Sequence, residues 1–330
     1  MNTLDPCSLS NAARESLRVG RKPKQVIFVY TLVLTALSLA TTLLDYLLGL
    51  QVDQTTGLDN MEFNSLLSSF RSLLPVAQMV VSACLQLGYL WTMLRVSRKL
   101  YADAHDLKKG FSRVGPLVRC FLLKMALYMG LSFLLTMPAS MLFSISPWAN
   151  SLNELMPVME DPNMAAALLT DPAAGNQLLL ALLPMVIMFA LVYLIVLIPV
   201  HFRLRMATYL LADDPQMGAM QALRTSAQMM RGNCMKLARV DLHLWWWHGL
   251  NVGLSLLMYM DLILSLLGIQ LPISAGSMEW ISYGLFLAAQ FAALYFLRNR
   301  TELVYTAAYE SLRPKPQEGN KLVLGNIFQM

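Results

Sequence analysis

Six long apolar runs divide this sequence, and they restrict its fold more than any other feature does. A helix of about 20 apolar residues crosses a hydrocarbon core about 30 Å thick. Hydrophobic residues make up 56% of the chain and charged residues only 14%, which is far from the composition of soluble domains. We therefore expect an all-α fold, a polytopic membrane helix bundle with about six transmembrane helices. The predicted spans are residues 25–50, 73–96, 116–143, 177–199, 240–267 and 280–297.

The charges beside these runs predict how the chain is oriented. Of the 25 lysines and arginines, Arg71 lies in a loop assigned to the outer side and Lys124 lies well within a span, whereas the other 23 lie on the inner side or at its flanks. Positive residues resist translocation, so this asymmetry predicts a multi-pass protein of the cell membrane with both termini cytoplasmic. The chain then consists of a cytoplasmic N-terminal segment (1–24), a six-span membrane domain (25–312) and a cytoplasmic tail (313–330).

The stretch between the fourth and fifth runs predicts a cytoplasmic helical hairpin. Asp214 precedes Pro215, and a capping carboxylate followed by proline at the first helical position is a typical helix start. Asp213 is the competing cap, one residue earlier. The helix predicted over 215–231 ends at Gly232, because glycine favours the turn that follows a helix.

The predicted helix is amphipathic. We expect its apolar face to lie against the inner leaflet or the inner ends of the spans, with Arg224 and Arg231 directed to phosphates or solvent. Four residues at helical spacing form that face, namely Met220, Leu223, Ala227 and Met230.

The segment that follows is too long for one helix across the membrane. As a single helix, residues 236–267 would extend about 48 Å at 1.5 Å per residue. Either its first turns lie in the membrane interface, or the helix breaks near Gly249 and Asn251.

Polar side chains also occur within the runs. Lys124 and Asp241 both lie close to the inner boundary on helices of opposite direction, so we expect them to form a polar pair. Asp45 lies near the outer end of its run, where Arg71 is the only nearby base. Stripes of hydroxyl residues at helical spacing, as in the first run, have two interpretations: they line a hydrated pathway, or they bond neighbouring helices.

No motif supports catalysis or a bound cofactor. The four cysteines show no paired spacing, and His243 and His248 are five residues apart, about 140° around a helix. We therefore predict no catalytic, metal-binding or cofactor-binding residue. The net charge of +5 follows from membrane topology and does not indicate nucleic acid as a partner.

The hairpin region resembles a bacterial integral-membrane family known as domain of unknown function nine-seventy-five. Gly110-Phe111 and residues 306–310 are similar to two further segments of that family, and residues 13–17 are similar to its N-terminal segment. This chain has Ile198-Pro199-Val200 where the family tends to have Ile-Pro-Gly. The resemblance implies a bacterial cell-membrane protein without an assigned activity. The matching residues are Asp214, Pro215, Ala222, Leu223, Ser226, Met230, Arg231, Gly232, Asp241, Leu242 and Trp245.

These observations favour a non-enzymatic membrane protein whose hairpin contacts the inner leaflet or a membrane or cytoplasmic protein partner. The lipid bilayer is the one partner that the runs require. A transporter or permease for a lipid or small amphiphile is the alternative, motivated by the hydroxyl stripes, and a lipid-acting enzyme ranks third. The hairpin motif to which we assign the contact consists of Asp214, Pro215, Ser226, Arg231 and Gly232.

Overall fold

The computed structural model is helical in the part of the chain that it describes, and it contains no strand there. The described residues are 5–19, 23–54, 61–146, 149, 183–184, 186–191, 193–260, 264 and 275–313. The outer loop predicted at 146–176 therefore lies almost wholly outside them, as do the end of the fifth run and most of the tail.

The helices follow the apolar runs and the polar segments between them. The first half contains α1 (Pro6–Val19), α2 (Pro23–Gln54), α3 (Met61–Ser97), the 3₁₀ helix η2 (Ala104–Arg113) and α4 (Val114–Ser144). The second half contains the π-helix η3 (Tyr193–Leu197), α8 (Ile198–Leu204), α9 (Ala207–Asp213), α10 (Ala219–Met229), α11 (Cys234–His243), α12 (Trp245–Leu257), α14 (Ala275–Ala293), the π-helix η4 (Leu294–Arg298) and α15 (Asn299–Leu312).

Five helical stretches among the described residues are long and apolar enough to cross a membrane, as expected of a multi-pass membrane protein. They correspond to five of the six predicted runs. The remaining run, 240–267, contains α12 and continues into residues outside the described ones. The five stretches are Lys24–Gly49, Ser65–Ser97, Ala104–Pro138, Val186–Asp213 and Trp280–Leu312.

Helices α2 and α3 form a long antiparallel pair, and α3 begins at Met61, earlier than the predicted span at residue 73. Its 37 residues extend about 55 Å, well beyond a hydrocarbon core of about 30 Å. A bidentate pair joins the two helices, with Arg71 Nε 2.6 Å from Asp45 Oδ1 and Nη2 2.9 Å from Oδ2. Pro75 lies inside α3.

The hydroxyl stripe of the first run makes contacts between helices. The Tyr283 hydroxyl of α14 lies 2.7 Å from Thr42 Oγ1 and 3.2 Å from Ser38 Oγ, both on α2. Thr41 donates to Gln78 of α3 at 3.0 Å. These bonds fit the interpretation in which the stripe bonds neighbouring helices.

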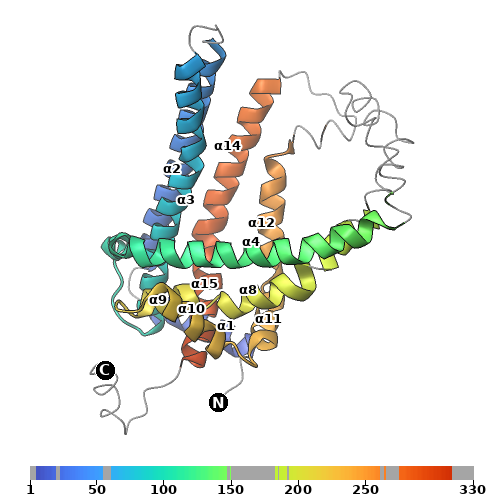
Figure 1. Ribbon diagram of the computed structural model, residues 1–330. Coiled ribbons are helices and arrows are strands. Elements are labelled where there is room, and N and C mark those ends of the chain that lie inside the picture. The colour runs from blue at the N-terminus through green and yellow to red at the C-terminus, as the bar shows by residue number, and fades with distance from the viewer. Residues whose placement is uncertain are drawn as a thin grey trace.

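Helix α4 has the predicted bounds to within two residues, yet its direction differs from that of the other apolar helices. Figure 1 shows α4 running across α2, α3 and α14 at a steep angle, whereas a span of the predicted bundle would stand beside them. Leu122, Met129 and Phe133 are exposed along it, so few side chains fix its direction. Helix η2, which packs on α3, directly precedes α4, and the membrane-spanning placement of α4 stays a prediction.

The helical path continues beyond Pro199, where the fourth predicted span ends, and α8 runs on to Leu204. A proline ring collides with the carbonyl four residues earlier in a regular α-helix. The π-helical turn η3 directly precedes α8, and its wider turn relieves that conflict.

The fifth apolar run breaks, but at Leu244 and not at Gly249 or Asn251. Leu244 has φ −96° and ψ 19°, outside helical values, and α12 begins at the next residue. Helix α12 runs from Trp245 to Leu257 without a break at Gly249, and the Asn251 side-chain amide donates to the Trp247 carbonyl at 2.7 Å. Leu244 is buried, which indicates that core packing places the bend.

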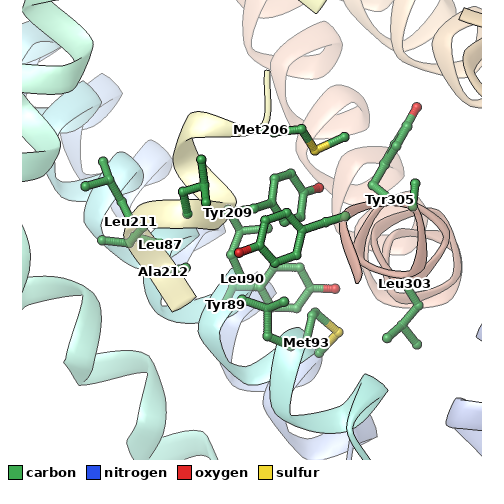
Figure 2. Close-up of a cluster of buried hydrophobic side chains, with 14 of the residues drawn as sticks. Leu87, Tyr89, Leu90, Met93, Met206, Tyr209, Leu211, Ala212, Leu303 and Tyr305 are labelled. Carbon is green, nitrogen blue, oxygen red and sulfur yellow. The ribbon is translucent and has the colours of Figure 1, made fainter. Parts of the chain in front are cut away.

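One end of the molecule, formed by α1, α9, α10, α11 and α15, gathers the polar contacts, and we call it the polar end (Figure 1). The N-terminal segment predicted as a separate region contributes α1, which packs on α15 and buries Leu9 and Ala13. Figure 2 shows the core beside it, where Tyr89 of α3, Tyr209 of α9 and Leu303 of α15 meet.

The backbone of helix η2 lies directly against the backbone of α3. A Cβ atom added at Gly110 would overlap the Cys84 carbonyl oxygen and lie 2.7 Å from the Gly88 nitrogen. One added at Gly88 would overlap the Leu107 carbonyl oxygen. Only glycine allows two backbones to approach this closely, which explains the Gly110-Phe111 segment of the sequence.

Candidate functional site

The hairpin begins differently from the sequence prediction. The Asp214 carboxylate accepts from the Gln216 N–H at 2.9 Å and forms a tight turn, so it does not cap a helix at Pro215. Helix α10 begins at Ala219 after Gly218, whose position provides no side-chain cap. The turn occupies the residues predicted as the first helical turn, and the predicted cap at Asp214 is therefore wrong.

The buried face of α10 also differs from the predicted apolar face. Met230 is buried as expected, but Met220 is 48% exposed and the centre of the face is Ser226. The Ser226 hydroxyl donates to the Arg203 carbonyl at 2.7 Å, which ties α10 to α8. Small residues at the contact let α10 lie close to α9, so packing distance decided the rotation of the helix. The buried residues are Ala219, Ala222, Ser226 and Met230.

The turn after α10 agrees with the sequence. Gly232 has φ +79°, in the left-handed region that glycine adopts readily, and α11 begins two residues later. Arg231 beside it is exposed.

Replacing Gly232 by alanine tests this turn. A Cβ atom there would meet no atom within 4 Å, so the cost comes from backbone conformation alone. We expect Gly232→Ala to lower the free energy of unfolding by about 1–2 kcal/mol. Gly232→Asn is the matched control, because asparagine tolerates the left-handed region, and it should cost clearly less. Equal losses in detergent unfolding titrations would contradict this account.

A buried carboxylate, Asp213, joins three elements of the polar end. Its side chain is 5% exposed, with Oδ1 2.7 Å from Arg98 Nη1 and Oδ2 3.0 Å from Arg313 Nη1. Tyr309 donates to Oδ2 at 2.9 Å, and Arg98 also lies 2.6 Å from Glu310. The hydrogen bonds to Asp213 and Glu310 raise the pKa of the Arg98 guanidinium above its ordinary value, against the effect of burial. We call these five residues the Asp213 hub.

The Asp213 hub was not predicted from the sequence, although the sequence contains two signals of it. Asp213 appeared only as a competing helix cap. Tyr309 and Glu310 belong to the closing segment that resembles the family. Acidic and basic residues at the ends of several runs on the same side are expected to meet, which would have favoured these contacts.

Asp241 has a different partner from the one predicted. Its carboxylate pairs with Arg205, which directly follows α8, and accepts from the Tyr305 hydroxyl at 2.7 Å. The Arg205 guanidinium also lies over the Tyr305 ring, 4.2 Å from its centre. Lys124 forms no ion pair with Asp241, because α8 lies against α11 and brings Arg205 to the carboxylate first.

Lys124 instead lines a cavity of about 320 Å³ on the side of α3 that faces α4. Two histidines line it as well: His248, and His201, whose Nδ1 lies 3.4 Å from the Tyr128 hydroxyl. Within the described ranges, no group of three or more histidine, cysteine or acidic side chains could hold a metal ion.

Comparison with known proteins gives one match. The model of a family described as "Protein of unknown function (DUF975)" matches residues 5–307. This is the family that the hairpin residues resemble. No curated protein and no solved structure matches the sequence.

Proposed function

Since the chain belongs to the DUF975 family, for which no activity is described, we propose a function from the surface of its polar end. It acts as a multi-pass protein of the bacterial cell membrane, with both termini cytoplasmic, and it catalyses no reaction. Its hairpin, formed by α10 and α11, rests on the anionic inner leaflet.

The observation that supports this proposal is the outward face of α11. Leu237 and Val240 are fully buried on the opposite side, whereas Met235 and Leu242 are 74% and 72% exposed. Residues seven apart lie on one side of a helix, so Met235 and Leu242 share a face, and the exposed Arg239 lies beside them.

Apolar side chains flanked by basic ones are typical of helices that lie in a membrane interface. Each basic residue near an anionic surface contributes about 1 kcal/mol to such binding. Trp245, 68% exposed, extends the face to the start of the apolar helix α12. The face is thus continuous with a membrane helix, which favours lipid over a separate protein partner.

Transport of a lipid or small amphiphile is less well supported as the main function. Of the hydroxyl residues of the first run, Ser38 and Thr42 contact Tyr283 of α14 and Thr41 donates to Gln78 of α3, whereas Thr35 bonds within α2. Such contacts stabilise a bundle whether or not it moves a substrate.

A lipid-quenching experiment tests the leaflet contact. In a background without the four native cysteines, Met235→Cys carries an environment-sensitive fluorophore in nanodiscs that contain brominated phosphatidylglycerol. We expect strong quenching, because position 235 lies at acyl-chain depth, and weaker quenching when Arg239→Gln is added. Asn11→Cys, on the exposed face of α1, is the control and should be quenched little. Equal quenching at both positions, or none at position 235, would refute the proposal. It would indicate that the outward face of α11 contacts a protein partner instead of lipid.

A further inference from the structure

The cavity lined by Lys124 lies between α3, α4, α9, α12 and α15, and its charge is unusual for the boundary of a membrane. Lys124, Arg205 and Arg298 all line it, and Glu302 is its one acidic lining residue. Cations at such depth are costly unless something compensates them.

The carboxylates near this cavity already have partners. Asp241 binds Arg205 and Tyr305, and Glu302 accepts from the Tyr209 hydroxyl at 2.5 Å. Both oxygens of Asp241 are therefore engaged within the protein, and so is one oxygen of Glu302.

Of the three cations that line the cavity, Lys124 and Arg298 form no ion pair within the described part of the chain. Arg298 lies near the rings of Tyr30 and Tyr89, at 5.4 and 5.7 Å from their centres, and its buried Nε has no hydrogen-bond partner there. It is the last residue of the π-helix η4, and π-helical turns often occur where a side chain serves a function.

A second cavity, of about 220 Å³, adjoins the first. The two cavities share Gln86, Leu90, Lys124 and Thr208 in their linings. The second is otherwise mostly apolar, with Leu117 and Phe121 among its walls. A cationic chamber beside an apolar one fits a molecule with an anionic head and a hydrocarbon tail.

We propose that these two cavities bind an anionic phospholipid, with its phosphate between Lys124 and Arg298 and an acyl chain in the apolar cavity. Arginine binds phosphate through paired N–H groups and lysine as a point charge, and both bonds are charge-assisted. Soluble phosphate esters share the head-group chemistry. The site does not depend on the contact of α11 with the leaflet.

Calorimetric titration of the full chain in uncharged detergent tests the site with three probes: short-chain phosphatidic acid, the matching diacylglycerol, and glycerol 3-phosphate. We expect phosphatidic acid to bind at least about ten-fold more tightly than either of the others, because each lacks one half of the ligand. Equal binding of glycerol 3-phosphate would support the phosphate site and assign a soluble ligand. Equal binding of diacylglycerol would overturn the proposal, and this comparison needs no variant.

Lys124→Met then locates the site. Lys124 has no ion pair to lose, so the variant should fold at least as well as the native chain while binding phosphatidic acid about ten-fold or more weakly. Lys124→Arg should retain binding. Arg224→Gln removes an exposed charge outside the cavity and should leave affinity unchanged. Native-like affinity in Lys124→Met would overturn the proposal.

Discussion

Replacing Asp213 by alanine is expected to lower the free energy of unfolding by about 2–4 kcal/mol, because Arg98 and Arg313 lose a buried carboxylate and Tyr309 loses its acceptor. Both arginines are partly exposed, so water can solvate their charges after the carboxylate is removed. We therefore expect a loss in the lower half of this range. Unfolding titrations in mixed micelles measure the change.

The neighbouring aspartate is a closely matched control. Asp214 is exposed, and its carboxylate accepts a hydrogen bond from the Gln216 N–H of the same turn at 2.9 Å. Asp214→Ala should therefore cost less than about 1 kcal/mol. Asp213→Asn keeps the shape and an acceptor for Tyr309 but removes the charge, so it should cost nearly as much as alanine. Similar losses for Asp213→Ala and Asp214→Ala would show that the hub does not stabilise the fold.

Adding one methyl group at Gly110 is expected to prevent native packing of η2 on α3, with a loss of about 3 kcal/mol or more. The new Cβ would overlap the Cys84 carbonyl oxygen, which is backbone and cannot rotate away. Gly88→Ala should behave alike, since its Cβ would overlap the Leu107 carbonyl oxygen. The yield of monodisperse protein and its melting temperature in detergent report the effect.

Two controls separate this contact from a general effect of removing glycine. Gly130→Ala lies in α4 with no atom within 4 Å of the new Cβ, so it should leave stability unchanged or raise it by about 1 kcal/mol. Leu107→Ala should not rescue Gly88→Ala, because the obstructing atom is a carbonyl and not a side chain. Native stability in Gly110→Ala would mean that η2 does not lie against α3 as described.

The Asp213 hub and the Gly110 contact both hold the segments between apolar helices against the ends of those helices. Arg98 precedes η2, Gly110 lies within it, and Asp213 ends α9, directly before the hairpin. The contacts of Asp213 therefore hold the residues that directly precede the hairpin. This arrangement leaves the outward face of α11 available for the contact that we propose.

The sequence by itself determined the features that depend on local properties of the chain. Long apolar runs become helices in any environment that removes their backbone from water, so the bounds of α4 were predicted to within two residues. The turn at Gly232 was predictable for a similar reason, because the left-handed φ belongs to glycine and needs no distant partner. The match of the family model over residues 5–307 confirms the resemblance seen in these local motifs.

Only the tertiary structure decided which charges meet and which side of a helix is buried. Tyr309 reaches Asp213 across 96 positions of sequence, and Asp241 binds Arg205 instead of Lys124. Helical periodicity alone allows several cations as partners for each carboxylate. The packing of α8 on α11 brings Arg205 to Asp241. In the same way, apolarity favoured Met220 for the buried face of α10, whereas the structure buries Ser226 there and bonds its hydroxyl to the Arg203 carbonyl of α8. The ion-pair partners and the buried face depend on the distances between helices, and no local sequence pattern contains those distances.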